Sequence, residues 1–156
     1  MLTIRLATPA DATALAHLRY EFRAALNPAT EDETTFVPRC AEWMAQRLVP
    51  VGPWRCWVLD AGYQIAGQLW LQLIEKLPNP VAEFELHGYI TNVYVRPEAR
   101  GSGAGGRLLK EALAFCREHH VDSVLLWPTP RSRPLYARHG FAVHDDVMEL
   151  HLGKRV

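Results

Sequence analysis

The hydrophobic and polar positions of this chain recur with two different periods, which divide it into expected strands and helices. Seven segments have the short apolar or alternating pattern of strands: Leu2–Leu6, Trp54–Asp60, Tyr63–Ile74, Glu83–Val95, Ser123–Trp127, Phe141–Val143 and Val147–Leu152. Four stretches have the spacing of helices, beginning after Thr8, at Pro38, after the glycines of residues 101–106 and near Tyr136. The order β-α-α-β-β-β-α-β-α-β-β predicts an α/β (α+β) fold with a mixed central sheet of about six to seven strands and about four flanking helices.

Local signals refine several of these elements. Thr8 is suited to cap the first helix, because Asp11 can accept a hydrogen bond from its amide. Pro38 is expected to open the second helix, since proline is favoured in a first turn. Ser123–Trp127 has the short apolar pattern of a strand covered on both faces. Asp145-Asp146 is the expected turn between the last two strands.

A glycine-rich segment separates an expected strand from an expected helix. The strand ends near Val95, and glycines at 101, 103, 105 and 106 precede a helix whose apolar face begins at Leu108. The first amides of a helix have no intrahelical acceptor and lie at the positive end of its dipole. Glycine lets a ligand approach the backbone closely because it has no Cβ. This pattern predicts a site for a phosphate or pyrophosphate group.

Two known nucleotide-binding motifs match these glycines only in part. Their spacing matches a P-loop, but Arg107 and Leu108 stand where that loop needs Lys and then Ser or Thr. The glycines also satisfy the dinucleotide pattern G-x-G-x-x-G, yet Arg96–Arg100 separates them from the strand. That motif further requires an acid at the end of the next strand, and Asp122 falls at its start. A nicotinamide-dependent oxidoreductase is therefore the weakest alternative.

The segment Arg100–Gly105 also has the form Arg-x-x-Gly-x-Gly, which resembles the acyl-CoA pyrophosphate loop of the GCN5-related N-acetyltransferase (GNAT) superfamily. A second motif of that family, a Tyr followed four and five residues later by Gly-Phe, is matched by Tyr136, Gly140 and Phe141. The opening segment Thr3–Asp11 also resembles the family's first strand and capped helix. The resemblance therefore covers nearly the whole chain.

This resemblance implies a single N-acetyltransferase domain over residues 1–156 that uses acetyl-CoA as co-substrate and needs no metal. In the family, amides of the glycine loop hold the CoA pyrophosphate, and the end of the central strand pairs with the pantetheine arm. The matching cofactor-binding residues are Val93, Val95, Arg100, Gly101, Ser102, Gly103, Gly105, Gly106, Arg107 and Thr129. Arg100 and Arg107 would add positive charge, and Thr129 stands where the family frequently has an Asn that contacts CoA.

The catalytic residues are also assigned through the resemblance. Tyr136 matches the phenol that protonates the departing thiolate, and a Tyr hydroxyl has a reference pKa of ~10, not far from that of an alkyl thiol. His87 lies near the start of the central strand, where some relatives carry a catalytic carboxylate, and imidazole accepts protons near neutral pH. Glu85 has the same strand parity and is the second candidate base. Many relatives instead use water and backbone carbonyls.

The composition is that of one globular domain without a global charge. The chain has 156 residues, of which 49% are apolar, and 17 basic side chains balance 17 acidic ones. We therefore expect neither nucleic acid nor a membrane as a partner. The three cysteines lack metal-ligand spacing, which is consistent with reduced thiols in a cytoplasmic protein. A homodimer is compatible with this fold.

These observations predict an N-acetyltransferase that moves an acetyl group from acetyl-CoA to a primary amine by direct attack in a ternary complex. The alternative is a non-catalytic acyl-CoA-binding or regulatory module on the same fold. No motif specifies the acceptor, which is a small molecule or a peptide amine. Trp43 and Trp70, with Phe22 and the acidic loop Glu31-Asp32-Glu33, are candidates to line its pocket.

Overall fold

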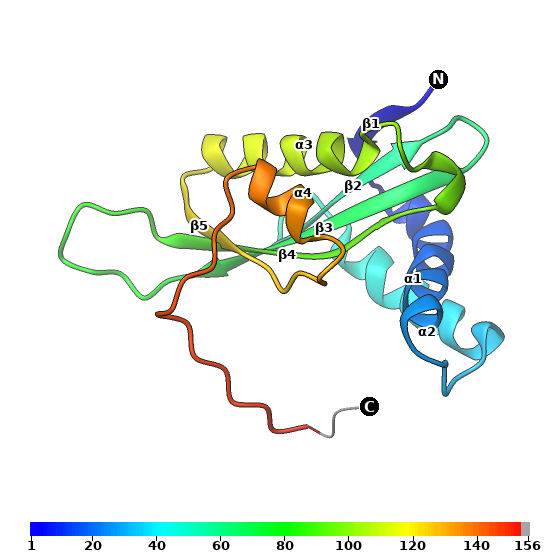
Figure 1. Ribbon diagram of the computed structural model, residues 1–156, viewed down its shortest axis with the longest axis horizontal. Coiled ribbons are helices and arrows are strands. Elements are labelled where there is room, and N and C mark those ends of the chain that lie inside the picture. The colour runs from blue at the N-terminus through cyan, green and yellow to red at the C-terminus, as the bar shows by residue number, and fades with distance from the viewer. Residues whose placement is uncertain (154–156) are drawn as a thin grey trace.

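A five-stranded sheet forms the centre of the computed structural model, which describes residues 1–153 (Figure 1). Lys154–Val156, the last residues of the predicted domain, lie outside the described residues. The strands, in sequence and in spatial order, are β1 (Thr3–Leu6), β2 (Trp54–Asp60), β3 (Ile65–Glu75), β4 (Leu86–Val95) and β5 (Val121–Leu125). All neighbours are antiparallel except β4 and β5, which are parallel. The predicted mixed sheet is thus confirmed.

Helices cover both faces of this sheet. They are α1 (Ala12–Leu26), α2 (Glu33–Arg47), α3 (Ala104–Glu118) and α4 (Arg133–Arg138), with short 3₁₀ turns at Pro9–Asp11 and Pro97–Ala99. In Figure 1, α3 runs along one side of the sheet and α1 and α2 lie on the other. Leu15 and Trp70 belong to the core beneath α1 and α2, whereas Leu71 and Leu108 belong to the core beneath α3. No helix within residues 1–153 has the length and apolar character needed to cross a membrane.

Side-chain caps stand at the 3₁₀ turn Pro9–Asp11, which leads into α1, and at the start of α2. The Asp11 carboxylate accepts a hydrogen bond from the Thr8 amide at 2.7 Å, as the sequence predicts. The second helix begins at Asp32, because its carboxylate accepts from the Thr35 amide at 2.8 Å. Pro38 therefore lies inside α2, and the prediction that it opens the helix is wrong. Burial of Val37 keeps this turn packed although proline donates no helical hydrogen bond.

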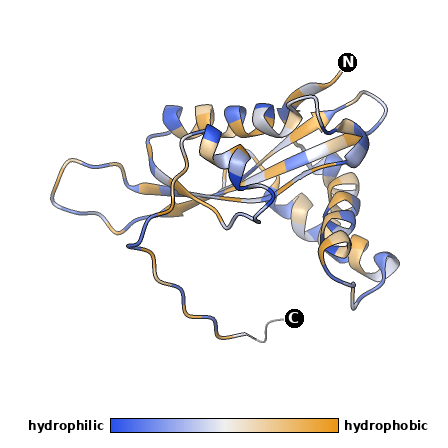
Figure 2. Ribbon diagram, in the orientation of Figure 1, coloured by the Kyte–Doolittle hydropathy of each residue, from blue (hydrophilic) through white to orange (hydrophobic). Residues whose placement is uncertain are grey.

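The last two predicted strands are not formed. Phe141–Val143 and Val147–Leu152 have neither strand nor helix, although the Asp145-Asp146 turn is present. The sheet therefore has five strands in the described part of the chain instead of six to seven. Figure 2 shows hydrophobic and hydrophilic residues alternating along this segment, which runs away from the sheet. Alternation specifies which face a strand would bury, but a strand exists only when a neighbour completes its backbone hydrogen bonds.

β5 is consequently an edge strand, not the doubly covered strand that its apolar pattern suggested. Its one partner among the described strands is β4, and Asp122, Ser123 and Leu125 are exposed. Trp127, just beyond the strand, is 61% exposed. The missing last strands and the exposed β5 have the same cause. The sequence pattern shows that a segment is apolar but does not show which other segment packs against it.

Candidate active site

The central strand β4 has a β-bulge at Asn92. Gln68 of β3 pairs with Tyr94 and Trp70 pairs with Thr91, so β4 has one more residue than β3 between these two pairs. Asn92 has a φ of 53°, in the left-handed region that Asn occupies more readily than most residues. The bulge therefore lies in the middle of the strand that precedes the glycine loop.

This bulge shifts the alternation of side chains along β4. Thr91 and Asn92 both line a cavity on the α1–α2 side of the sheet. Val93 and Val95 pack against the core on the α3 side. In a regular strand Thr91 and Val93 would share a face, because side chains alternate with a period of two. Odd-numbered residues of β4 therefore lie on the α1–α2 side before the bulge, as Tyr89 and Thr91 do, and on the α3 side after it.

The strand β4 also has an open edge. Its parallel pairing with β5 ends at Tyr89 and Leu125, and past that pair no described strand continues the ladder on that side. Trp127 packs edge-on against Tyr89 where the strands diverge, with ring centroids 5.1 Å apart. Val93 and Val95 lie on this open stretch. Unpaired strand edges present backbone N–H and C=O groups to a ligand.

The glycine loop presents six consecutive amides, those of residues 101–106, without a hydrogen-bond acceptor in the described part of the chain. The Arg107 amide, which follows them, donates to the Gly103 carbonyl at 3.0 Å. Gly101 and Gly103 have φ of +81° and +74°, and a Cβ on either would meet no atom within 4 Å. Free donors therefore border open space at the positive end of α3, an arrangement suited to an anion.

Two other glycines of the loop bring α3 and α4 together. A Cβ on Gly105 would lie 3.5 Å from Leu135 Cδ2, and one on Gly106 would lie 3.3 Å from His139 Cε1. The absence of side chains at these positions lets α4 pack closely against the first turn of α3. Gly105 and Gly106 thus have a packing role in addition to any contact made by their amides.

The polar side chains of the loop are engaged within the protein. Arg100 Nε donates to the Val95 carbonyl at 2.8 Å, and Ser102 Oγ donates to the Ala99 carbonyl at 3.0 Å. The Arg107 guanidinium donates to the Leu2 carbonyl at 3.1 Å, at the start of β1. Arg100 and Ser102 stabilise the turn that shapes the loop. Arg107, which is predicted to add charge at the phosphates, also ties α3 to the segment just before β1.

The Tyr136/Gly140/Phe141 motif forms the C-terminal cap of α4. Gly140 has a φ of 91°, its amide donates to the Ala137 carbonyl at 3.1 Å, and the Phe141 amide donates to the Tyr136 carbonyl at 3.1 Å. The Phe141 ring packs on the Tyr136 ring at 5.7 Å. These contacts are those of a Schellman motif with its apolar contact, which explains why the three residues occur at this spacing.

The Tyr136 ring is buried, with 8% of the residue exposed. Its hydroxyl makes no hydrogen bond to another described residue and is not itself enclosed. Burial raises the pKa of this phenol above its ordinary value. The hydroxyl is thus held protonated and available to a ligand.

Thr129 belongs to the turn that leads into α4. Its Oγ1 donates to Ser132 Oγ at 3.0 Å and accepts from the Ser132 amide at 3.2 Å. Ser132 Oγ in turn accepts from the Thr129 amide at 2.9 Å. The hydroxyl predicted to contact CoA therefore already stabilises the entry to the helix that carries Tyr136.

The two candidate bases lie at the other end of β4. His87 Nδ1 is 2.7 Å from Ser123 Oγ on β5, in an exposed cross-strand contact. Val93 lies six positions after His87 along the strand, which corresponds to about 20 Å. Glu85 precedes the strand and lines a cavity of about 590 Å³ near the β3–β4 hairpin. Both residues therefore lie at the opposite end of β4 from the glycine loop.

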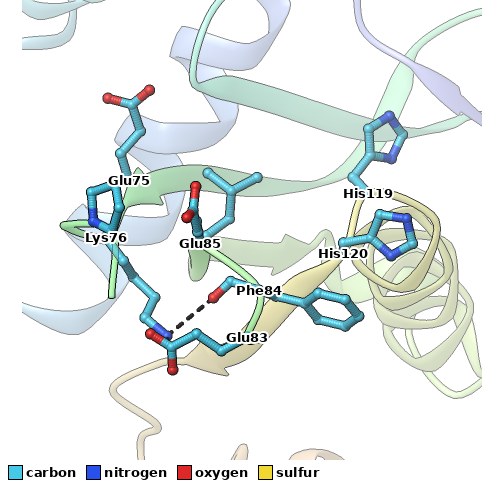
Figure 3. Close-up of a pocket in the computed structure, with 9 residues that line it drawn as sticks. Glu75, Lys76, Glu83, Phe84, Glu85, His119 and His120 are labelled. Carbon is cyan, nitrogen blue, oxygen red and sulfur yellow. Dashed lines mark hydrogen bonds and ion pairs between the residues drawn. The ribbon is translucent and has the colours of Figure 1, made fainter. Parts of the chain in front are cut away.

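That hairpin cavity, shown in Figure 3, has acidic residues on one side and His119 and His120 on the other. Lys76 pairs with Glu83 at 3.3 Å and with Asp122 at 3.2 Å. His119 stacks on Phe115 with ring centroids 3.8 Å apart, and His120 lies tilted against Phe84 at 4.9 Å. Lys76 and the two histidines therefore already have partners within the protein. Residues 1–153 contain no group of three or more His, Cys, Asp or Glu that could hold a metal.

A second cavity, of about 450 Å³, adjoins the bulge of β4. We call it the tryptophan cavity; it is lined by Arg19, Phe36, Arg39, Cys40, Trp43, Met44, Trp54, Trp70, Tyr89, Thr91 and Asn92. Its size is typical of small-molecule sites. Trp43 and Trp70 were predicted here from the sequence. Arg19, Thr91 and Asn92 were not; a polar Thr-Asn pair inside an apolar strand is the signal that could have indicated them.

The other predicted acceptor-pocket residues do not line the tryptophan cavity. Phe22 stacks on Tyr94 at 5.2 Å in the core. Each acid of the loop is engaged: Glu31 pairs with Arg39, Asp32 caps α2, and Glu33 lies 2.7 Å from His17. This loop therefore stabilises α1 and α2 and does not offer free carboxylates to a cationic amine.

The comparison with protein families agrees with this geometry. The model of the Acetyltransferase (GNAT) family matches residues 18–141, most of the chain. The chain belongs to the GNAT acetyltransferase family. The matched range includes the glycine loop, the open edge of β4 and the Tyr136/Gly140/Phe141 motif, so the family assignment rests on the elements that form the candidate active site.

Solved GNAT-type structures share the fold over nearly the full length. A predicted acetyltransferase from Clostridium acetobutylicum, solved with acetyl-CoA, has a TM-score of 0.80 at 23% identity, covering 97% of each chain. A GCN5-related N-acetyltransferase from Ralstonia eutropha JMP134 has a TM-score of 0.75 at 26% identity, covering 98% of this chain and 100% of that one. These likenesses establish the shared fold.

One curated relative gives a more specific comparison. The glucosamine 6-phosphate N-acetyltransferase of Trypanosoma brucei brucei is 34% identical over 65 residues. That match spans 42% of this chain and 44% of the relative, less than half of either. It therefore supports the GNAT assignment without carrying the relative's acceptor to this protein.

Proposed function

We propose that this GNAT protein transfers an acetyl group from acetyl-CoA to the primary amine of a small acceptor. The observation that carries the proposal is the placement of six unpaired amides, residues 101–106, directly after an open-edged strand. Such a site combines donors for a diphosphate with a strand edge for an extended amide-containing arm. Family membership supports acyl transfer as the chemistry.

Acetyl-CoA supplies an activated acyl group, and the chain supplies its binding site. The amides around Gly101 and Gly103 would hold the diphosphate, because their left-handed backbone opens onto free space. The backbone of Val93 and Val95 would pair with the pantetheine arm along the open edge of β4. The bulge at Asn92 would then bring the thioester beside the tryptophan cavity.

The reaction joins the acceptor nitrogen to the thioester carbonyl carbon and breaks the carbon–sulfur bond. Tyr136 would donate its phenolic proton to the departing sulfur, and its protonated state at neutral pH suits that role. The acceptor must first lose an ammonium proton, and the second proton that its nitrogen loses as the amide forms would return to Tyr136. No carboxylate or imidazole is among the described residues that line the tryptophan cavity. Water in the open cavity would therefore take the ammonium proton, as in relatives without a dedicated base.

Calorimetry with acetyl-CoA and CoA tests the binding step, and release of free thiol in the presence of amines tests the transfer. The amine panel includes glucosamine 6-phosphate, the amine in the name of the trypanosomal relative. We expect both thioester and CoA to bind and at least one amine to release thiol. Absence of binding would refute the proposal. Binding without release for any amine would favour the non-catalytic acyl-CoA-binding module.

A further inference from the structure

Arg19 differs from the other arginine of the tryptophan cavity in having no carboxylate partner among the described residues. Arg39 is neutralised by Glu31 through two hydrogen bonds and lies over the Phe36 ring at 5.0 Å. Arg19 makes one long contact, from its NH1 to Asn92 Oδ1 at 3.4 Å. Burial lowers the pKa of Arg19, and the nearby charge of Arg23 lowers it further. The positive charge of Arg19 is therefore not balanced by a carboxylate of the described residues.

The neighbours of Arg19 are polar groups that can also bind an anion. Thr91 and Asn92 both line the cavity because the bulge turns them to the same side of β4. The Asn92 amide group and the Thr91 hydroxyl make no other side-chain hydrogen bond within the described chain. Arginine presents a planar set of donors that matches carboxylate and phosphate oxygens. One corner of the cavity thus combines an unneutralised guanidinium with two short polar side chains.

The remaining wall of the cavity is aromatic. Trp43, Trp54 and Trp70 form a cluster with centroid distances of 5.3, 6.0 and 6.1 Å. Trp70 is fixed by a 2.9 Å hydrogen bond from its Nε1 to the buried Gln68 side chain. A rigid aromatic wall favours a flat or apolar ligand body over a fully hydrated one.

We propose that the acceptor is a small amine that also carries an oxyanion, which binds Arg19, and an apolar body, which packs on the tryptophan cluster. This inference rests on the proposed function, because it names the acceptor of that reaction. Carboxylates and phosphate-type groups share the required chemistry. The amine would lie toward Asn92, where the cavity meets the open edge of β4.

The test uses three amines with one benzyl body: 2-phenylethylamine, L-phenylalanine and 1-amino-2-phenylethylphosphonate. Their dissociation constants are measured by calorimetry with the full chain saturated with CoA, and acetylation is followed by thiol release. We expect at least one anionic amine to bind 10-fold or more tightly than 2-phenylethylamine. The dissociation constants of L-phenylalanine and the phosphonate show whether the site prefers a carboxylate or a phosphonate group.

Substitutions at Arg19 test whether this residue binds the oxyanion. Arg19→Gln should weaken binding of the preferred anionic amine by about 10- to 100-fold and change that of 2-phenylethylamine less than about 3-fold. Arg19→Lys should recover part of the loss because it keeps the charge. Arg23→Gln is the matched control, since it removes the same charge one turn later on α1 from an exposed side chain; both amines should bind as to the wild type.

The inference is overturned if wild-type protein binds 2-phenylethylamine, which has no oxyanion, as tightly as the two amines that carry one, or binds none of the three. It is also overturned if Arg19→Gln affects both classes equally while its acetyl-CoA affinity is normal. The wild-type comparison decides the question even if Arg19→Gln does not fold. A failure to bind CoA would refute the proposed function itself, so the two failures can be told apart.

Discussion

Replacing Gly103 by Asn tests the anion site with little disturbance of the fold. Gly103 caps α3 with a φ of +74°, and a side chain there would meet no protein atom within 4 Å. Asn is one of the few residues that accept this left-handed conformation. The substitution should therefore leave the loop folded while it fills the space in which a diphosphate would lie.

The expected magnitudes separate these two effects. The left-handed backbone costs an Asn about 1 kcal/mol relative to Gly, which lowers the melting temperature by about 2–4 °C for a domain of this size. A hydrogen bond to a charged phosphate contributes about 1.5–3 kcal/mol. Loss of one such contact would raise the dissociation constant for acetyl-CoA by about 10- to 150-fold. The loss of affinity should thus greatly exceed the loss of stability.

Gly62 provides the matched control. It lies in the β2–β3 hairpin with a φ of +87°, and a Cβ there would also meet no atom within 4 Å. Gly62→Asn should lower the melting temperature as much as Gly103→Asn and leave the calorimetric affinity for acetyl-CoA unchanged. Unaltered acetyl-CoA affinity in Gly103→Asn would show that the amides after β4 are not the phosphate site. Equal losses of affinity in both variants would point to a general defect in folding.

Three further substitutions test other parts of the molecule. Tyr136→Phe should lower kcat by about 100-fold or more without changing the calorimetric affinity for acetyl-CoA, and a kcat within 3-fold of wild type would remove Tyr136 from the mechanism. His87→Asn should change kcat less than 3-fold because His87 contacts Ser123 far from the loop; a 100-fold loss would restore it as the base. Hydrogen bonds from the Arg5 guanidinium hold the pKa of Asp11 at about 2, below its ordinary value of 3.8. Asp11→Asn should therefore cost at most about 2 kcal/mol at pH 7, and most of its difference in melting temperature from wild type should be lost as the pH falls from 4 to 2. A difference at pH 2 as large as that at pH 7 would contradict this assignment.

The sequence was most informative where a local motif determines its own geometry. The Thr8/Asp11 cap depends on residues three apart and forms as predicted. The Tyr136/Gly140/Phe141 motif closes its own helix, so its spacing can be recognised without knowledge of the rest of the fold. The glycine loop is similar, since the helix start and the left-handed residues are set within a few positions. Local hydrogen bonds explain these successes.

Predictions were wrong where the answer depends on a distant partner. The alternation in Val147–Leu152 is that of a strand, but the chain leaves Leu150 and Leu152 81% and 87% exposed with no strand beside them. The structure also gives Arg107 a partner that no local pattern indicates, the Leu2 carbonyl just before β1. The acids of residues 31–33 likewise have partners, Arg39 and His17, on elements whose approach no local pattern indicates.

The bulge at Asn92 shows why the acceptor cavity was the hardest part to predict. If β4 alternated regularly, Thr91, Val93 and Val95 would lie on the same face as Tyr89. All of them would then contact the same ligand. The extra residue instead leaves Thr91 with Asn92 beside the tryptophan cavity and turns Val93 toward the α3 side. If the donor lies along Val93 and Val95 as we propose, one strained residue separates the two substrates on a single strand. Asn92→Gly should then preserve both sites because it keeps the left-handed backbone, whereas deletion of Asn92 should restore regular alternation and abolish transfer. Full thiol release by the deletion variant would show that the bulge does not position the substrates.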